Sequence, residues 1–427
     1  MSVCSGGSGG IVPPVTPAEF IDRHPGDLLK RLQKLVRLST VNPPGENYDP
    51  ITAILVAELK ALGLTARRYP IPAAVLKASL PPEQHVHPRF NVLGKLPVPS
   101  AKKTIHINAH YDVVPVSGRW QHGNPFSGAI EDGWIYGRGT SDMKGSIASL
   151  LMALQALRAT RSTPRMNLEV SFTADEETDS LLGTGWLVQN APIRPDYAIV
   201  MEGGEGNRVC CGHNGTAWLE VIVHGRAAHG SLPERGVNAL EKMAALVRAL
   251  DGYKRILARR TWRTPEGKIM RPTINVGGVF SCGEGAKINT VPAHASFTID
   301  RRVLAIDNHA AADRELRGFL RAAARRIPQC RITIRSVSEN YSCFSEPKHP
   351  FFAAMAGVVG RVRKEKAGFN VSTGFNDMHF FSHYLKIPTL GYGPGGEKEH
   401  AVDERTQVKE LLASAKIYAE LLTTFAG

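Results

Sequence analysis

Five separate segments of the chain each supply a histidine or a carboxylate that could bind a metal ion. The five residues are His110, Asp142, Glu177, Glu202 and His400. Taken singly, each has an ordinary explanation, such as a solvated loop histidine, an exposed acidic loop or, for Asp142, a helix N-cap. Two imidazoles and three carboxylates together suit a pair of divalent transition ions, because zinc, manganese and cobalt all accept these ligands. The joint pattern therefore predicts two such ions, with Asp142 as the bridge between them.

Neighbouring residues could support such a centre. His110 and Asp112 are two positions apart in a strand-like segment and would share one face of it, so the carboxylate could orient the imidazole. In TADEETDS (173–180), Glu176 and Glu177 follow a buried strand, at the sheet edge where open α/β folds bind ligands. Adjacent carboxylates repel each other, so this cluster costs stability unless a cation or a proton compensates it.

The elements that would position these residues alternate along the chain. Residues 17–38 and 51–62 have helical spacing of apolar positions, and short buried strands alternate with further helices, which indicates an α/β fold with a mainly parallel sheet flanked by helices. After residue 211 the strands become longer and two-faced, with two helices near 237–250 and 307–326. We expect one catalytic domain made of residues 1–211 and 342–427, interrupted by an α+β domain at 212–341.

The composition narrows the classes of function. The 427 residues are 43% hydrophobic and 21% charged, as in soluble globular proteins, and no apolar run is long enough to cross a membrane. The net charge of +13 suggests, as one alternative, a non-catalytic protein that binds nucleic acid or another anion. The sequence contains no nucleic-acid-binding motif, however. The six cysteines show no metal-type spacing, and the first residues lack the pattern of a signal peptide. We expect a cytoplasmic protein that binds neither nucleic acid nor membrane.

Several longer motifs carry a resemblance to a known family. HINAHYDVVP, PFSGAIEDGWIYGRGTSDMKG, TADEETDS, GRAAHGSLPERGVNAL and INTVPAHASFTIDRRV occur in this order and cover most of the chain. Together they resemble the di-metal aminoacylases, a family of metallopeptidases that includes acetylornithine deacetylase, succinyl-diaminopimelate desuccinylase and the glutamate-releasing carboxypeptidases. The resemblance implies a di-zinc exopeptidase-like catalytic domain with an inserted lid, which usually makes the contact of a homodimer or a higher homo-oligomer.

The resemblance also implies a role for each matched residue. His110, Asp142 and Glu202 would bind one metal ion, and Asp142, Glu177 and His400 the other. Asp112 would orient His110, and Glu176 would be the general base. His229 on the lid would stabilise the oxyanion, often in the partner subunit's site. The residues that would bind a substrate carboxylate are Asn289, Arg302 and Gly374.

Two segments depart from the family pattern at the substrate end of the pocket. His213 and Asn214 stand where several relatives have arginine or lysine, and His379 stands where relatives often have arginine. The leading hypothesis is hydrolysis of an amide C–N bond in a small carboxylated substrate, such as an N-acyl amino acid or a dipeptide. The altered pocket keeps a second hypothesis open, in which the same site releases ammonia from a carboxylated aromatic amine.

Overall fold

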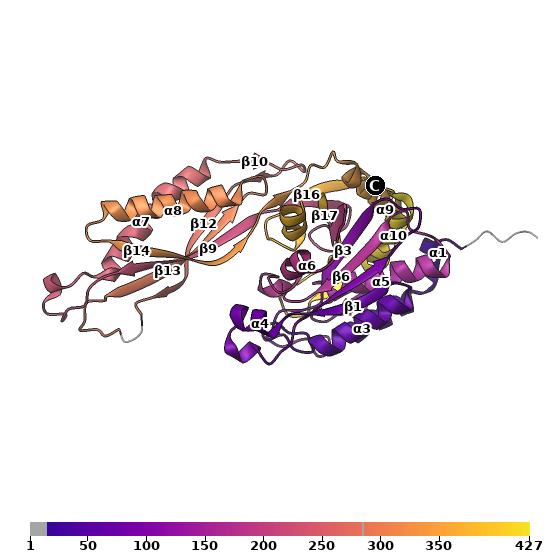
Figure 1. Cartoon of the computed structure of the whole chain (residues 1–427), viewed down its shortest axis with the longest axis horizontal. Coiled ribbons are helices and arrows are strands. Elements are labelled where there is room, and N and C mark those ends of the chain that lie inside the picture. The colour runs from indigo at the N-terminus through magenta and orange to yellow at the C-terminus, as the bar shows by residue number, and fades with distance from the viewer. Residues whose placement is uncertain (1–14, 284–285) are drawn as a thin grey trace, which may run out of the picture.

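The computed structural model describes residues 15–283 and 286–427 of the chain. Figure 1 shows a broad body and a narrow arm. The arm consists of the elements between Gly215 and Asn340, and the body is built from the chain segments on both sides of it. Both ends of the chain therefore contribute to a single body, which carries all five predicted metal ligands.

A twisted nine-stranded sheet forms the centre of the body, in the order β1-β2-β6-β3-β7-β17-β8-β15, with β16 paired to β8. The middle strands β6, β3, β7 and β17 run parallel, whereas β1, β2, β8 and β15 pair in antiparallel fashion towards the edges. The strands are β1 (Thr65–Pro70), β2 (Phe90–Leu96), β3 (Thr104–His110), β6 (Asn167–Thr173), β7 (Tyr197–Val200), β8 (Arg208–His213), β15 (Cys343–Phe344), β16 (Gly368–Ser372) and β17 (Thr389–Gly391).

Helices cover both faces of this sheet, because its central strands are apolar on both sides. On β7, Ile199 belongs to the main hydrophobic core, while its neighbours Ala198 and Val200 belong to a second core on the opposite face. The helices are α1 (Pro17–Arg23), α2 (Pro25–Val36), α3 (Tyr48–Ala61), α4 (Ala73–Ser79), α5 (Lys144–Ala159), α6 (Thr184–Asn190), α9 (Pro350–Arg363) and α10 (Val408–Thr424), with a π-helix at Phe380–Leu385 and 3₁₀ turns at Pro82–Gln84 and Glu176–Thr178.

A small sheet joins the two loops that carry Asp142 and His400. It consists of β4 (Ala129–Glu131), β5 (Trp134–Tyr136) and β18 (Arg405–Gln407). Arg405 pairs with Tyr136, so the chain just after the His400 loop runs beside the chain just before the Asp142 loop. Segments about 260 residues apart in the sequence are thereby fixed next to each other.

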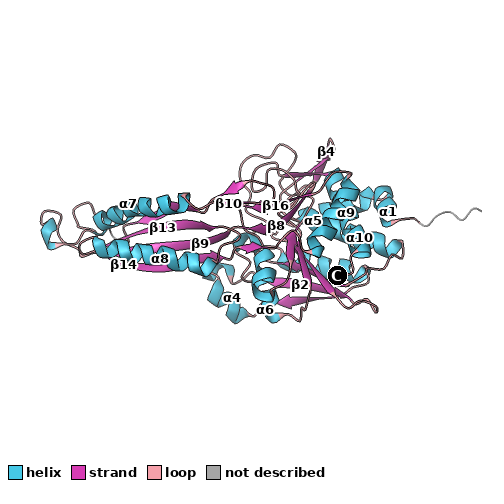
Figure 2. Ribbon diagram, turned by 90° about the horizontal axis from the view of Figure 1, so that it is seen from above, coloured by secondary structure: helices cyan, strands magenta, loops and turns pink. Residues whose placement is uncertain are grey.

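The arm is a four-stranded antiparallel sheet, in the order β12-β13-β9-β14, with two long helices on one face (Figure 2). On its central strand β9, buried residues alternate with half-buried ones, and Leu219, Val221 and Val223 are buried in the arm's core with residues of α7 and α8. The elements are β9 (Gly215–His224), α7 (Ala239–Ala258), β12 (Thr273–Ser281), β13 (His294–Val303), α8 (His309–Arg326) and β14 (Arg331–Asn340), with a 3₁₀ turn at Pro233–Arg235.

A short hairpin, β10 (Trp262–Arg263) and β11 (Ile269–Met270), leaves the arm between α7 and β12 and returns to the body. Met270 is buried in the main core of the body, and the ring of Trp262 packs edge-on against Phe344 at 5.1 Å between centroids. This hairpin is therefore a second attachment of the arm, besides the strands through which the chain enters and leaves it.

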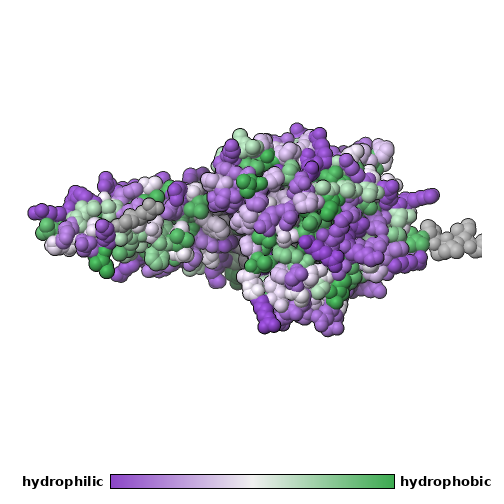
Figure 3. Space-filling model, turned by 90° about the horizontal axis from the view of Figure 1, so that it is seen from below, coloured by the Kyte–Doolittle hydropathy of each residue, from purple (hydrophilic) through white to green (hydrophobic). Residues whose placement is uncertain are grey.

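The predicted fold class is confirmed, with two differences in detail. The sheet is parallel at its centre and antiparallel at its edges, and the helix expected at 17–38 is two helices, because Pro25 starts a new one after His24. The face in Figure 3 is mostly hydrophilic, with small scattered apolar patches. Over the described ranges, no helix combines the length and apolarity that crossing a bilayer requires.

Candidate metal centre

The carboxyl ends of three neighbouring parallel strands deliver most of the predicted site residues. His110 is the last residue of β3, Glu176 and Glu177 lie in the turn after β6, and Glu202 follows β7. The strands are in register here, since His110 pairs with Thr173 and Asn108 with Val200. Parallel strands that end together place the residues that follow them at one edge of the sheet.

Asp142 lies between the two histidines. Its Oδ1 is 3.0 Å from Nε2 of His110, and its Oδ2 is 3.2 Å from Nε2 of His400. Helix α5 takes Met143 as its N-cap and has no side-chain cap, so the alternative role of Asp142 as a helix cap is wrong. One carboxylate thus presents its two oxygens to two imidazoles that come from distant segments.

The two remaining carboxylates suit metal ligands by their burial and lack of partners. Oε2 of Glu177 is 3.1 Å from Nε2 of His400, whereas its Oε1 is buried and has no hydrogen-bond partner within the described chain. Oε1 of Glu202 is likewise buried and unpartnered among the described residues. A buried carboxylate oxygen without a partner costs free energy, and a cation would compensate it. His110, Asp142 and Glu177 also have ligand atoms within 4.8 Å of one another.

The electrostatics of the cluster indicate missing positive charge. Burial raises the pKa of Glu177 to about 7, and the nearby Asp142 carboxylate adds to the rise. Burial also raises the pKa of Glu176 and of Glu202 well above the ordinary value, and neighbouring carboxylates, Glu177 and Asp377 among them, add to both rises. Ionised acids held at such positions need a compensating cation. The donor set, two imidazoles and three carboxylates, fits divalent transition ions.

Asp112 organises the residues around His110. Nδ1 of His110 donates to the backbone carbonyl of Asp112 at 3.1 Å and lies 3.4 Å from its carboxylate. The fully buried carboxylate of Asp112 accepts backbone N–H groups from Glu176 at 3.1 Å and from Glu177 at 3.2 Å. Asp112 therefore holds both the imidazole and the acidic turn in place.

Asn42 connects this carboxylate to the rest of the acidic turn. Its Nδ2 donates to Asp112 at 3.1 Å, to Asp175 at 3.0 Å and to the hydroxyl of Thr178 at 2.9 Å. Asp175 itself has a left-handed backbone and is compensated by the buried guanidinium of Arg89 at 3.0 Å. Tyr48 also donates to Asp175, at 2.9 Å. The N-terminal segment thus fixes the backbone from which Glu176 and Glu177 extend.

Glu404 fixes the backbone of the loop that carries Asp142. Its Oε1 accepts the backbone N–H groups of Gly139, Ser141 and Asp142 at 2.9–3.0 Å, and its Oε2 accepts from the guanidinium of Arg138 at 2.5 Å. The side chain of Glu404 is fully buried. Because Glu404 lies four residues after His400, one side chain connects the loops of two predicted metal ligands.

Glu176, the predicted general base, lies beside His110. Its Oε2 is 3.9 Å from Nε2 of His110, farther than the nearest oxygen of Asp142. The charges of Glu202 and Asp377 add to the burial that raises the pKa of Glu176. Asp377 is buried, and the hydroxyls of Ser180 and Thr184 donate to it.

The predicted substrate residues fall into two groups. Arg302 and Gly374 line one cavity of about 550 Å³ together with Asn214. His213 and His379 are buried next to each other, with perpendicular rings whose centroids are 5.5 Å apart. Burial lowers the pKa of His213 to about 4 and that of His379 well below its usual value, so the pair is uncharged at neutral pH.

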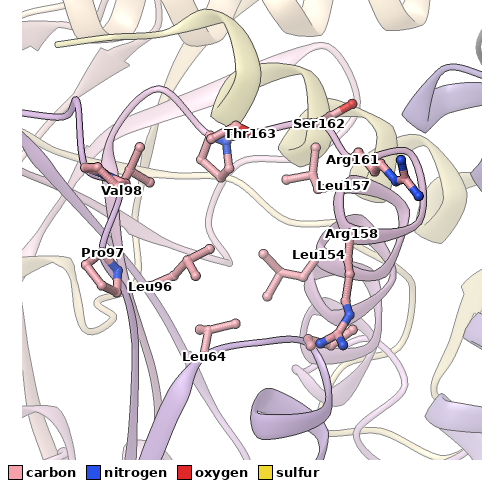
Figure 4. A pocket seen from close by; sticks show the side chains of 13 residues that line it. Leu64, Leu96, Pro97, Val98, Leu154, Leu157, Arg158, Arg161, Ser162 and Thr163 are labelled. Carbon is pink, nitrogen blue, oxygen red and sulfur yellow. The ribbon is translucent and has the colours of Figure 1, made fainter.

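His229 and Asn289 lie together on the arm. The backbone N–H of Gly230 donates to the carbonyl of Asn289 at 2.7 Å, and both predicted residues are exposed. Over the described residues of this one chain, neither forms a hydrogen bond or an ion pair with the metal cluster. A separate hollow of about 360 Å³ between α5 and the end of β2, lined mainly by leucines and prolines (Figure 4), contains none of the predicted site residues.

The comparisons with known proteins agree with this geometry. Residues 106–424 match the sequence pattern of Peptidase family M20/M25/M40. The chain belongs to this family. It is therefore a metal-dependent hydrolase of C–N amide bonds, and the resemblance of its motifs is confirmed.

Two relatives are similar in sequence to this chain over most of their own length. A succinyl-diaminopimelate desuccinylase of Rhodopseudomonas palustris (strain BisA53) is 30% identical over 326 residues, which cover 74% of this chain and 81% of the relative. An acetylornithine deacetylase of Photorhabdus laumondii subsp. laumondii is 27% identical over 389 residues, covering 89% and 91%.

Solved structures show the same fold. The M20 family metallo-carboxypeptidase Sso-CP2 of Sulfolobus solfataricus has a TM-score of 0.73 at 20% identity, covering 94% of this chain and 99% of that one. The YXEP protein of Bacillus subtilis, described as a dinuclear metal-binding peptidase of the M20 family, has a TM-score of 0.67 at 14% identity, covering 95% and 98%.

Sequence reasoning did not find the residues that support the metal centre in this family member. Asn42 lies outside the matched range, and its only local signal is a polar residue directly before two prolines. Glu404 lies in an acidic loop beside His400, where its type alone suggests a solvated side chain. Their roles depend on contacts with segments far away in the sequence.

Proposed function

We propose that this chain hydrolyses an amide bond of a small carboxylated substrate at a pair of divalent metal ions bridged by Asp142. The observation that carries the proposal is the position of Asp142, whose two oxygens face His110 and His400 at 3.0 and 3.2 Å. A carboxylate that faces one histidine on each side suits the bridge of a two-metal site.

The ligand sets follow from the neighbours of each histidine. His400 lies beside Glu177, which supports Asp142, Glu177 and His400 as one set. Glu202 interacts electrostatically with His110 and Asp142, which supports these three as the other. Its buried, unpartnered oxygen is the atom that a metal ion would satisfy. Imidazole and carboxylate ligands bind zinc, manganese and cobalt alike, so this ligand set does not identify the metal.

The chemistry of the reaction then divides between the ions and Glu176. When bound, divalent ions supply Lewis-acid activation of water and of the scissile carbonyl. Glu176 takes a proton from the attacking water and delivers it to the leaving nitrogen, as a C–O bond forms and the C–N bond breaks. Its raised pKa helps it to hold the proton between these two steps.

Substrate binding is assigned to the cavity between body and arm. Arg302 offers a planar cation for the substrate carboxylate, and Gly374 leaves room for it. The neutral His213 and His379 add no positive charge on the body side. The names of the relatives described above favour amide hydrolysis over the deamination alternative.

The arm is proposed to act as a lid and to form a homodimer. His229 and Asn289 are exposed, and within the described residues neither contacts the metal cluster of its own chain. His229 would therefore donate a hydrogen bond to the oxyanion in the site of a partner subunit. Exposed apolar residues on the arm support such a contact, among them Phe280 at 75% exposure and Ile288 at full exposure.

Metal analysis of the purified protein, combined with a substrate screen, tests the proposal. Loading metal-free protein with zinc, manganese or cobalt should give two bound ions per chain and hydrolysis of N-acyl amino acids or dipeptides. Asp142→Asn should lose both ions. Two ions retained in that variant, or loaded protein that hydrolyses none of these amides, would contradict the proposal.

A further inference from the structure

A column of buried polar side chains leads through the body to His110. One face of the central strands β3 and β6 is apolar, with Ile107 and Val170 in the main core, as expected for strands that are buried on both sides. The opposite face of the same strands is polar and in register up to His110. The residues of this polar column are His106, Asn108, Glu169, Ser171 and Thr173. Because buried polar groups cost free energy unless they are hydrogen-bonded, the partners of the column show what it holds in place.

Hydrogen bonds connect the side chains of the polar column to one another and to α6. Nδ1 of His106 donates to Glu169 at 3.2 Å, and the hydroxyl of Ser171 donates to Nε2 of His106 at 2.7 Å. Ser171 in turn accepts from the amide of Asn108 at 3.0 Å. The same amide donates to the hydroxyl of Thr184 at 3.1 Å. The column therefore continues from the two strands to the first residue of α6.

The inner end of the polar column is the buried carboxylate of Asp377. The hydroxyl of Thr184 donates to its Oδ2 at 2.5 Å, and the hydroxyl of Ser180 donates to its Oδ1. Ser180 closes the acidic turn, residues 175–180, because its backbone N–H donates to the carbonyl of Asp175 at 2.7 Å. A continuous set of contacts thus runs from the polar column through Asp377 to the end of this turn.

The acidic turn depends on outside contacts because its backbone is strained. Asp175, Asp179 and Ser180 have φ angles of 58°, 75° and 54°, in the left-handed region that residues other than glycine seldom adopt. Such a conformation persists only where the surroundings hold it. Asp112 holds the middle of the turn through two backbone N–H groups, and Asp377 holds its end.

We propose that His106 and Ser171 are positioning residues of the metal centre. The polar column fixes the carboxylate of Asp377, and Asp377 fixes the turn from which Glu176 and Glu177 extend. This inference rests on the proposed function, because it takes Glu177 as a metal ligand. The column residues act through the turn and do not themselves bind the ions or the substrate.

Two buried serine hydroxyls give a matched pair of variants. Ser171→Ala breaks the polar column, whereas Ser149→Ala removes an equally buried hydroxyl of α5, which donates to the carbonyl of Leu411 at 3.0 Å outside the column. We expect Ser171→Ala to lower zinc affinity and kcat by about 10-fold each, with KM unchanged. Ser149→Ala, with a similar loss in melting temperature, should change neither. Competition with a chelator and steady-state kinetics measure these effects.

A double-mutant cycle tests whether the column acts through Asp377. The double variant Ser171→Ala/Asp377→Asn should bind zinc no more weakly than Asp377→Asn alone, because both changes release the same turn. His106→Gln, which can still donate to Glu169 and accept from Ser171, should keep the wild-type affinity, whereas His106→Leu should lose it. If His106→Leu does not fold, Ser171→Ala still decides. Additive effects in the cycle, or equal zinc affinity of Ser171→Ala and the wild type, would overturn the proposal.

Hydrogen exchange in metal-free protein separates this inference from the proposed function. A peptide covering residues 175–181 should exchange about 10-fold faster in Ser171→Ala than in the wild type or in Ser149→Ala, because the turn opens more often. Unchanged exchange in a protein that binds two ions and hydrolyses amides would overturn the role of the column and leave the hydrolase intact. Faster exchange in a protein whose wild type binds no ions would keep the column and overturn the metal centre.

Discussion

Glu404 accepts the backbone N–H of Asp142 at 3.0 Å with the same oxygen that accepts the N–H groups of Gly139 and Ser141. Three donors converge on one buried oxygen, and the second oxygen accepts from Arg138. The proposed bridging ligand is therefore held by a residue that is not itself one of the proposed metal ligands. Residues that orient ligands in this way commonly change metal affinity by about 10–100-fold when they are replaced.

The first prediction concerns this contact. Glu404→Gln keeps the shape of the side chain but removes its charge, and leaves the guanidinium of Arg138 buried without a counter-ion. We expect metal affinity to fall by about 10–100-fold and unfolding free energy to fall by about 3 kcal/mol. Competition with a metal chelator and urea unfolding measure the two effects. Glu397→Gln, which breaks the exposed pair with Arg405, should change neither; an unchanged metal affinity in Glu404→Gln would contradict the assigned role.

The second prediction separates the two adjacent glutamates. Glu176→Gln should still bind two ions but lose about 10²–10⁴-fold in kcat, because only the proton acceptor is removed. Glu177→Gln should lose one ion as well as activity, because its carboxylate faces His400 at 3.1 Å. Elemental analysis after dialysis, together with steady-state kinetics, distinguishes them. If the two variants exchanged these phenotypes, the roles of base and ligand would have to be exchanged too.

The third prediction tests the support that Asn42 gives to the acidic turn. Asn42→Ala removes donors from Asp112, Asp175 and Thr178, and we expect a loss of about 1–3 kcal/mol in unfolding free energy together with weaker metal binding. Asn42→Asp should be worse, since it places a third carboxylate between two others. Asn190→Ala, at the exposed end of α6, is the control. Equal stability of the Ala and Asp variants would show that charge at this position is unimportant.

The fourth prediction concerns acid sensitivity at His213. Burial lowers its pKa from 6.5 to about 4, so below pH 6.5 the unfolded chain binds a proton that the folded chain excludes. Stability should therefore decrease as the pH falls from 6.5 to 4, by about 3 kcal/mol from this residue. Urea unfolding at several pH values should show a smaller decrease for His213→Gln than for the wild type. A decrease of the same size in both would exclude His213 as the cause, and His24→Gln, at an exposed position, should behave as the wild type.

The fifth prediction addresses the subunit contact. Phe280→Asp or Ile288→Asp places a charge on an exposed apolar residue of the arm, and should convert a dimer into monomers in analytical ultracentrifugation. Activity should fall in parallel, because His229 would no longer reach a partner's site. Val337→Asp, on strand β14 with 58% exposure, is the control. Monomers with full activity would remove the partner subunit from the mechanism.

The sequence predicted the fold, and it singled out His110, Asp142, Glu177 and His400, which the structure brings close together, because both leave local patterns. Leu28, Leu32 and Leu35 recur at helical spacing and do lie on the buried face of α2. His110 and Asp142 are noticeable because imidazole and carboxylate groups next to glycines and strand ends suggest metal binding. The distances between these residues were not predictable, because they depend on the register of β3 against β6 and on the pairing of β5 with β18.

Other functional residues leave no such pattern. Glu404 acts by accepting backbone N–H groups, which any nearby carboxylate of suitable position could do, so neither its type nor its spacing identifies it. Lys268 and Arg271 line the cavity that also contains Arg302, and nothing in their local sequence indicates this position. Their place in the cavity depends on Met270, an arm residue that is buried in the core of the body.

The pairing of β5 with β18 also has a consequence for biosynthesis. His400 and Glu404 follow Asp142 by 258 and 262 residues in the chain. Until the segment that carries them has been synthesised and has folded back, the acidic groups lack both their second imidazole and the carboxylate that shapes the 138–142 loop. The proposed metal site is therefore completed late, when β18 pairs with β5.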